Sequence, residues 1–288
     1  MTAPLPYIKM NGLGNDFVVL DGRASKIVLT RQEVIAIADR ATGIGCDQVI
    51  IMEPDSVAGV DVFMRIYNAE GGEVDACGNA TRCIAGLVAT ETGLDAVTIR
   101  TNAGLILTKI AGDQVTADMG VPRFEWDQIP LAEPFADTTG IELQVGPIDA
   151  PVLHTPSVVN VGNPHAIFWV KDLAAHDLAR FGPLLENHPI FPERANITVA
   201  QVLAPDRIRV RVWERGAGLT EACGTAACAT AVAAARKGLA ERKVTIELPG
   251  GPLDIDWRAS DDHILMTGPW TRDGAGTISA ELLAGAAA

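Results

Sequence analysis

Two cysteines carry the strongest chemical signal in this sequence. Cys77 and Cys223 each lie in an Ala-Cys-Gly triplet that precedes a segment of small apolar residues. This pattern predicts a helix that begins at each Cys-Gly pair, where unsatisfied N–H groups and the positive end of the helix dipole favour a thiolate. We therefore expect each thiol to have a pKa below the ~8.5 of a free cysteine. The same N–H groups can bind a carboxylate, and they belong to Gly78, Asn79, Gly224 and Thr225.

The two cysteines occupy equivalent positions of an internal repeat. An offset of 146 positions (223 minus 77) carries residues 63–89 onto residues 209–235 without a gap. The matched pairs include Arg65 with Arg211, Tyr67 with Trp213 and, at a slightly different offset, Gly14-Asn15 with Gly162-Asn163. We infer two homologous halves rather than a solenoid, because there are only two copies and each is long enough to be a domain.

The repeat sets the expected domain boundaries. We expect an N-terminal domain over residues 1–123, to which the tail 272–288 returns, and a C-terminal domain over residues 124–271. The predicted class is α+β: two pseudo-symmetric domains, each a curled mixed sheet around a central apolar helix. The central helices are expected at residues 80–89 and 226–235, because a helix that is apolar all round is buried.

The rest of the secondary structure follows from periodicity. β-Branched content and alternation predict strands over residues 16–20, 60–68, 97–110 and 208–214. Amphipathic patterning predicts surface helices over residues 31–41 and 173–187.

A paired-thiol site can invert an α-carbon. One thiolate removes the proton from one face while the opposite thiol protonates the other face, and the helix N–H groups stabilise charge that spreads into the carboxylate. A lone cysteine near a helix start is more often structural, since free cysteine is among the most buried residue types. Identical, repeat-related triplets favour catalysis. Duplication alone would also preserve them, so a non-catalytic binding protein is an alternative.

The other chemical classes have weaker support. The cysteines lack the paired Cys-x₂₋₄-Cys spacing of a zinc site, and the five histidines are scattered, so we expect no metal. A thiol redox protein is a further alternative, but Cys-x-x-Cys is absent. We expect Cys83 and Cys228 to be core residues, and Cys46 has no clear role.

Charge and composition exclude several partners. The 288 residues are 48% hydrophobic and 20% charged, with a formal net charge of −13. That balance argues against nucleic acid and an anionic membrane surface as main partners. Residues 1–10 resemble no signal peptide and no apolar run approaches the ~20 residues of a membrane span, so we expect a cytoplasmic protein.

Two charged residues break the repeat near Cys223. Glu214 and Arg215 stand where the first half has Asn68 and Ala69, as expected for an asymmetric substrate. Arg215 could grip a second carboxylate bidentately; the alternative is a surface ion pair. Asn15, Asn163 and Asn196 lie in short loops, where asparagine usually serves turn chemistry.

Taken together, the motifs resemble diaminopimelate epimerase. The matching segments are Asn11-Gly-Leu-Gly-Asn-Asp-Phe17, Gly43-Ile-Gly-Cys-Asp-Gln48, Tyr67-Asn-Ala-Glu-Gly71, Ala76-Cys-Gly-Asn-Ala-Thr-Arg-Cys83, Gly162-Asn-Pro-His165, Pro192-Glu-Arg-Ala-Asn196, Trp213-Glu-Arg-Gly-Ala-Gly218 and Ala222-Cys-Gly-Thr225. The resemblance implies interconversion of LL- and meso-diaminopimelate, for lysine and peptidoglycan synthesis, without pyridoxal phosphate or another cofactor. It also implies a homodimer and a site between the two domains.

The resemblance assigns roles by position. It makes Cys77 and Cys223 the acid/base thiols, with Cys223 accepting and Cys77 donating a proton from LL to meso, and it makes His165 and Glu214 the groups that adjust them. It implies substrate contacts at Asn15, Gln48, Asn68, Gly78, Asn79, Asn163, Asn196, Glu214, Arg215, Gly224 and Thr225.

The sequence also departs from the family pattern. The departures are Asn11 for a frequent His, Glu70-Gly71-Gly72 for Asp-Gly-Ser, and Ala80 and Ala226 for glycines. None removes a group assigned to chemistry.

The nearest alternative function is that of a proline or hydroxyproline racemase of the same fold. Arg215 and Glu214 argue against it, because a small ring substrate has no distal charged head.

Overall fold

The computed structural model describes residues 4–285 and divides into two compact units. The first contains the described residues through Ala117 together with those from Gly268 onward, and the second is Asp118–Thr267. Residues 1–3 and 286–288, which the sequence analysis assigns to the N-terminal half, lie outside the described residues. No helix of the described part is both long and apolar enough to cross a membrane.

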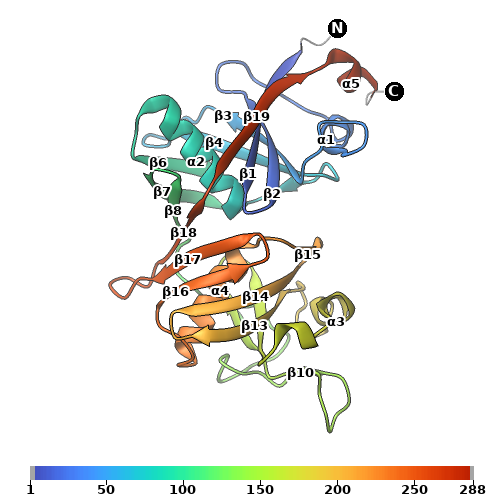
Figure 1. Ribbon diagram of the computed structural model, residues 1–288, viewed down its shortest axis with the longest axis vertical. Helices are drawn as coiled ribbons and strands as arrows, with labels where there is room; N and C mark the ends of the chain where they lie inside the picture. The colour runs from blue at the N-terminus through green and yellow to red at the C-terminus, as the bar shows by residue number, and fades with distance from the viewer. Residues whose placement is uncertain (1–3, 286–288) are drawn as a thin grey trace. The chain divides into compact units, whose positions relative to one another are not determined.

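The first unit is a mixed sheet with one central helix (Figure 1). Antiparallel and parallel pairings join its strands in the order β19-β1-β2-β3-β4-β6-β7-β8, with β5 added beside β4. The strands are β1 (Leu5–Gly12), β2 (Asn15–Asp21), β3 (Gln48–Glu53), β4 (Val62–Asn68), β5 (Glu73–Val74), β6 (Ala96–Thr101), β7 (Gly104–Ala111), β8 (Gln114–Asp118) and β19 (Thr271–Ile278). The helices are α1 (Arg31–Ala38), α2 (Gly78–Thr92) and α5 (Ala280–Gly285).

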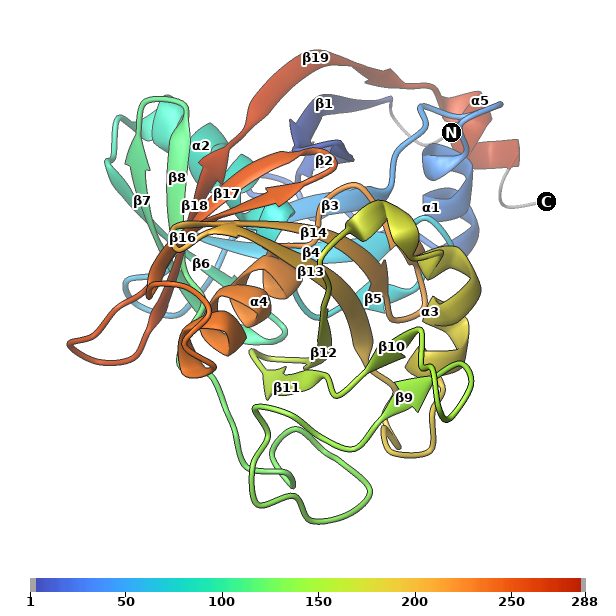
Figure 2. The ribbon, with the colours of Figure 1, turned by 60° about the horizontal axis from the view of Figure 1, so that its bottom comes forward.

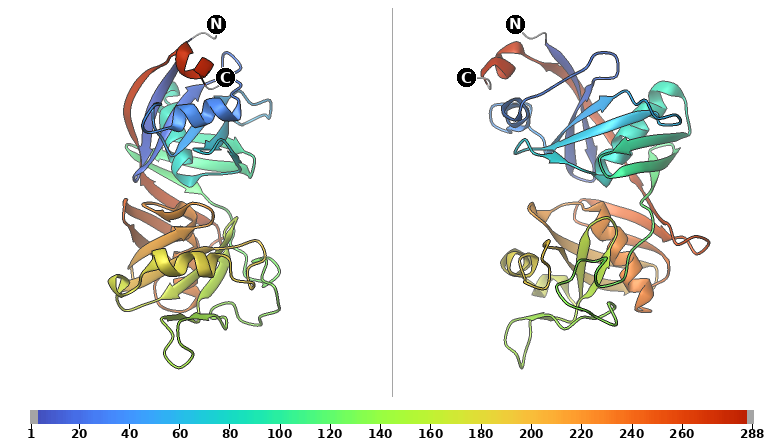
Figure 3. Two further views of the ribbon diagram at one scale, coloured as in Figure 1. Left: turned by 90° about the vertical axis from the view of Figure 1, so that its right-hand side faces the viewer. Right: turned by 180° about the vertical axis from the view of Figure 1, so that it is seen from behind.

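Helix α2 is the core of the first unit. It contacts β1 near one end of the strand order and β6 and β7 near the other, so the sheet curls around it (Figures 1 and 3). Every residue from Asn79 to Ala89 is buried, as expected for a helix that is apolar on nearly all sides. Gly86 lets the indole ring of Trp270 pack directly against the backbone of α2, since a Cβ at this position would collide with that ring.

The second unit repeats this plan around α4 (Gly224–Arg236). Its strands pair in the order β11-β12-β13-β14-β16-β17-β18, with β15 beside β14. Helix α4 contacts strands from β11 to β17, and Figure 2 shows it beneath that sheet. The strands are β9 (Gln144–Val145), β10 (Leu153–His154), β11 (Ser157–Asn160), β12 (Pro164–Trp169), β13 (Asn196–Ala204), β14 (Arg207–Glu214), β15 (Gly218–Thr220), β16 (Lys243–Leu248), β17 (Gly251–Trp257) and β18 (Ile264–Pro269). A 3-10 turn, η1 (Leu173–Ala175), and helix α3 (Leu178–Glu186) complete the unit.

The strand register confirms that the halves are structural repeats. Val49 pairs with Tyr67 across β3 and β4, and the equivalent residues of the second half, Ile197 and Trp213, pair across β13 and β14. The β2–β3 and β12–β13 pairs are both parallel, whereas the following pairs are both antiparallel. The predicted class, a curled mixed sheet around an apolar helix in each pseudo-symmetric half, is therefore correct.

Three predicted elements need correction. The single strand at 97–110 is the hairpin β6–β7, which turns at Asn102 and Ala103, directly before Gly104 with φ +130°. The helix at 173–187 is two elements, because His176 is extended and Asp177 caps α3 by accepting the Arg180 N–H. The helix at 31–41 ends at Ala38, since Asp39 leaves helical geometry and its carboxylate accepts the Ala41 and Thr42 N–H groups.

Candidate functional site

Cys77 is the N-cap of α2, as predicted. Its backbone is extended (φ −148°, ψ 112°), and the helix begins at Gly78. The half-buried thiol donates a long hydrogen bond of 3.7 Å to Asn15 Oδ1 at the start of β2. The free N–H groups in the first turn of α2 therefore begin directly beside the Cys77 thiol. Such N–H groups can bind an anion.

A hydrogen-bonded chain fixes the amide groups around Cys77. Asn15 donates through Nδ2 to Asp47 at 2.9 Å, and Asn79 donates through Nδ2 to Asn15 Oδ1 at 3.4 Å. Arg82, fully buried in α2, donates to Asn79 Oδ1 at 3.0 Å and to Pro269 O at 3.2 Å. Asp47 and Arg82, which the sequence analysis did not select, therefore fix the positions of these amides.

Gln48 and Asn68 are cross-strand partners at neighbouring strand ends. Asn68 uses Oδ1 to accept the N–H groups of Glu70 and Gly72, which is turn chemistry. The Gln48 Oε1 atom is buried and has no hydrogen-bond partner among the described residues. A buried polar atom without a partner is costly, so this amide is suited to a ligand.

Cys223 is the N-cap of α4 in the same extended geometry (φ −129°, ψ 106°). Unlike Cys77 it is buried, with 5% of its surface exposed, and Sγ lies 3.5 Å from Thr225 Oγ1. Burial raises the pKa of the Cys223 thiol well above its ordinary value, and the charge of Glu214 raises it further. The expected lowering of this pKa is therefore wrong for Cys223, because desolvation outweighs the helix N-terminus.

Glu214 lies at the end of β14, beside Cys223. Its carboxyl accepts the Thr220 hydroxyl at 2.5 Å. Burial raises the pKa of Glu214, whereas hydrogen bonds from Thr220 and Cys223 lower it. The thiol and the carboxyl are thus two groups that each resist ionisation and can share one proton.

His165 is a fully buried, neutral group on β12. Its Nε2 lies 2.8 Å from Asn163 Oδ1, and its Nδ1 has no partner among the described residues. Burial and the nearby charge of Arg215 lower the His165 pKa to about 3. The ring therefore acts at neutral pH by holding Asn163, whose Nδ2 donates to Thr225 Oγ1 at 3.4 Å.

The Arg215 side chain has no carboxylate partner among the described residues. Its N–H donates to Asn196 Oδ1 at 2.9 Å, and its guanidinium donates to the Glu193 carbonyl at 2.8 Å. Within residues 4–285 it makes no ion pair, so the alternative of a surface ion pair fails. The guanidinium keeps donors for a planar anion such as a carboxylate.

Asp47, Arg82 and Glu186 are supporting residues that the sequence analysis missed. Glu186 of α3 is buried and accepts N–H groups of Trp213 (2.7 Å) and Gly216 (3.0 Å), which fixes the loop that carries Arg215. A signal was available for Arg82, a charged residue within a predicted apolar helix. None marked Glu186.

The structure places the selected residues in two groups, one in each unit. The first gathers Asn15, Gln48, Asn68, Cys77, Gly78 and Asn79, and the second gathers Asn163, His165, Asn196, Glu214, Arg215, Cys223, Gly224 and Thr225. The first group has a thiol as its one ionisable side chain, whereas the second adds a carboxyl, an imidazole and a guanidinium to its thiol. Within residues 4–285, no cluster of three or more His, Cys, Asp or Glu side chains is placed to hold a metal ion.

Solved structures define the class of fold. The chain resembles a hydroxyproline epimerase from Agrobacterium vitis with a TM-score of 0.68 and 12% identity, over 96% of this chain and 93% of that one. It resembles a Bacillus anthracis phenazine biosynthesis protein of the PhzF family with a TM-score of 0.66 and 17% identity, over 96% and 100%. The chain therefore shares its fold with these two proteins.

Sequence comparison assigns the chain within that class. The family described as diaminopimelate epimerase matches residues 7–125 and 157–272. A diaminopimelate epimerase of Rhodopseudomonas palustris (strain BisB18) is 56% identical over 282 residues, 98% of this chain and 97% of that protein. One of Rhizobium meliloti (strain 1021) is 54% identical over 275 residues, 94% and 91% of the two chains. The chain belongs to the diaminopimelate epimerase family, and the predicted family and enzyme class, an amino-acid epimerase, are confirmed.

Proposed function

We propose that this enzyme interconverts LL- and meso-diaminopimelate by proton transfer between the substrate α-carbon and the thiols of Cys77 and Cys223. The observation that carries the proposal is that a cysteine caps the same end of the same helix in both repeats. The family membership supports the substrate.

The proposed chemistry needs one thiolate and one thiol at a time. In the LL to meso direction Cys223 removes the α-proton and Cys77 delivers a proton to the opposite face. Glu214 is suited to take the proton of Cys223, because both groups have raised pKa values and Glu214 accepts a hydrogen bond from this thiol. The N–H groups at the starts of α2 and α4 stabilise the carboxylate as its carbon loses the proton.

The distal, non-reacting head of the substrate is proposed to bind Arg215 and side-chain amides of the two groups. Arg215 lacks an ion pair in the described chain, and the Gln48 Oε1 atom lacks a donor, so both retain unused hydrogen-bonding capacity. Proline or hydroxyproline, as a substrate, would leave Arg215 without a carboxylate to bind. This favours a substrate with two amino-acid heads.

We further propose that the enzyme acts in the cytoplasm as a homodimer, without pyridoxal phosphate or a metal. The resemblance to the family supports these points. Light scattering coupled to size exclusion tests the dimer. Full activity of protein treated with a chelator, in a buffer free of pyridoxal phosphate, tests the independence from cofactors.

Two single variants test the proposed mechanism. Cys77→Ala and Cys223→Ala should each reduce epimerisation of LL-diaminopimelate by at least about 10³-fold, because each removes one of two acid/base groups. Cys83→Ala is the matched control, since Cys83 is a buried thiol in the core of α2. Chiral chromatography measures the conversion, and near-wild-type turnover by either N-cap variant would rule out the mechanism.

A further inference from the structure

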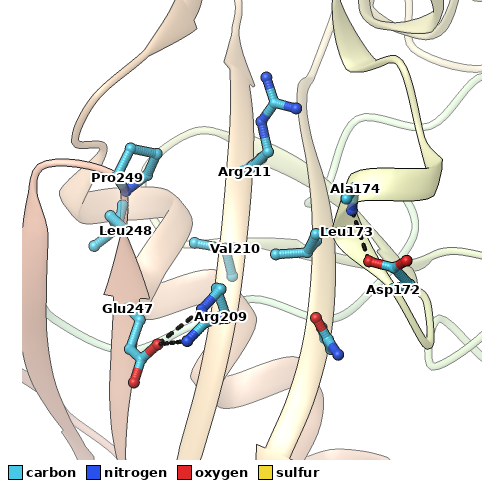
Figure 4. Close-up of a pocket in the computed structure, with 10 residues that line it drawn as sticks. Asp172, Leu173, Ala174, Arg209, Val210, Arg211, Glu247, Leu248 and Pro249 are labelled. Atoms are coloured by element: carbon cyan, nitrogen blue, oxygen red, sulfur yellow. Dashed lines mark hydrogen bonds and ion pairs between the residues drawn. The ribbon is translucent and has the colours of Figure 1, made fainter.

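The outer face of the second unit carries a cavity distinct from the proposed catalytic residues. It has a volume of about 450 Å³ and lies over β13, β14 and β16 beside η1 (Figure 4). Its lining includes Asp172, Leu173, Gln201, Arg211, Glu247 and Pro249. None of them is assigned a role in epimerisation.

Most charges in this cavity are already engaged. Arg209 pairs with Glu247 at 2.8 Å, and the Asp172 carboxylate accepts the Ala174 N–H at 2.9 Å. Arg211 has no hydrogen bond or ion pair from its guanidinium within residues 4–285. Figure 4 shows its side chain extending away from the Arg209–Glu247 pair. The Arg211 residue is half-buried.

The repeat shows what this arginine lacks. Its counterpart Arg65 pairs with Glu53 at 2.7 Å and with Glu73 at 2.5 Å. Strand register identifies the residues that replace these acids: Glu53 corresponds to Gln201, and Glu73 corresponds to Leu219. The second unit has therefore kept the cation and lost both carboxylates that neutralise it in the first.

We propose that this cavity binds the anionic group, a carboxylate or a phosphate, of a small molecule whose apolar part lies against Leu173 and Pro249. No acceptor within residues 4–285 reaches the Arg211 guanidinium, so its planar donors are available to an anionic ligand. With a net charge of −13 the whole protein repels anions. Binding must then depend on the local group, Arg211.

Charge-matched variants test this site. Inorganic phosphate and benzoate would be titrated into wild type, Arg211→Gln and Arg207→Gln at constant ionic strength, with binding measured by calorimetry. Arg207 is the control because it lies on the same face of β14 and 3.8 Å from Glu247, a lining residue, but does not itself line the cavity. We expect Arg211→Gln to weaken binding by roughly ten-fold or more, whereas Arg207→Gln binds as wild type does. Preference for one probe identifies the anion class. Equal affinities of all three proteins for both probes, or no binding to wild type, would overturn the proposal.

Gln201→Glu provides a second, independent variant. It restores the acid that Glu53 supplies in the first unit, so an internal carboxylate should occupy Arg211. We expect this variant to remain folded, to melt at a higher temperature and to lose the Arg211-dependent binding. Unchanged phosphate and benzoate affinities in a folded Gln201→Glu protein would contradict the inference. Epimerase activity is not a readout here, so the outcome is independent of the proposed function.

Discussion

At Cys223 two physical effects oppose each other. The start of α4 favours a thiolate, whereas burial and the Glu214 charge favour the thiol, and the pKa is raised. The sequence revealed the helix start because that signal is local. It could not reveal the burial, which depends on strands distant in the chain, and so the predicted direction of the pKa shift was wrong.

The coupling of Cys223 to Glu214 gives a prediction for thiol titration. Glu214→Gln removes a negative neighbour, so the pKa of Cys223 should fall relative to wild type. Peptide-resolved alkylation rates as a function of pH measure it. Glu70→Gln, an exposed acid of the first unit, is the control and should leave the profile unchanged. A Cys223 profile that stays in place or moves to higher pH would show that Glu214 does not act on this thiol.

His165 gives a prediction for stability against pH. Its pKa is about 3 in the folded chain and about 6.5 in an unfolded one, so only the unfolded state gains the proton in between. The contribution of His165 to the free energy of unfolding is therefore fully present above pH 6.5. It is lost as the pH falls towards 3, by up to about 1.4 kcal/mol per pH unit.

His165→Phe is the substitution that tests this dependence, because register places Phe17 at the equivalent position of the first half. The free energy of unfolding, from urea denaturation between pH 7 and 4.5, should fall less steeply in the variant. The exposed His154→Gln should keep the wild-type slope. A His165→Phe protein that loses stability as steeply as wild type would refute the assignment.

At the scale of elements, the correct predictions came from signals carried by short stretches of sequence. The repeat, both helix starts and the strand at Ile208–Glu214 were predicted from local triplets and alternation. The hairpin at Gly104 was missed because β-branched residues on both sides hid a two-residue turn. The break at His176 depends on caps from Asp172 and Asp177, which amphipathic periodicity alone does not show.

Gly86 gives a prediction about packing in α2. Alanine is favoured over glycine within a helix by about 1 kcal/mol, but its Cβ would collide with Trp270. Overpacking costs about 1–3 kcal/mol, so we expect Gly86→Ala to destabilise the protein despite its better helix propensity. Thr92→Ala, at an exposed position of the same helix, should change stability by less than about 0.5 kcal/mol. Thermal denaturation compares them, and a stabilised Gly86→Ala would mean that Trp270 moves aside freely.

At the scale of the whole molecule, the residues that would contact substrate were selected largely through family motifs. The residues that hold them, Asp47, Arg82 and Glu186, were not. Asp47 and Arg82 lie inside matched motifs and Glu186 lies outside them, but the hydrogen bonds of all three become visible only when the chain is folded. The Arg215 side chain shows the same limit, since its lack of an ion-pair partner in the described residues could not be predicted from spacing.

Substrate selectivity tests the role assigned to the distal head. Proline and alanine lack a second amino-acid head and would leave Arg215 unpaired, so we expect turnover at least about 10³-fold below that of diaminopimelate. Arg215→Gln should reduce activity on diaminopimelate while changing the slow alanine reaction little. Racemisation followed by polarimetry measures both. Comparable rates for diaminopimelate and alanine would contradict the assignment.

The central claim, proton exchange through two opposed thiols, is tested most directly by incubating LL-diaminopimelate with reduced enzyme in heavy water and following the first turnovers by mass spectrometry. Because one thiol removes the proton and the other delivers one from solvent, the meso product should carry deuterium at the inverted carbon while remaining LL substrate is initially unlabelled. Cys77→Ala and Cys223→Ala should give no inverted product. Inverted product that retains the original proton, or inversion that survives loss of either thiol, would contradict the two-thiol mechanism.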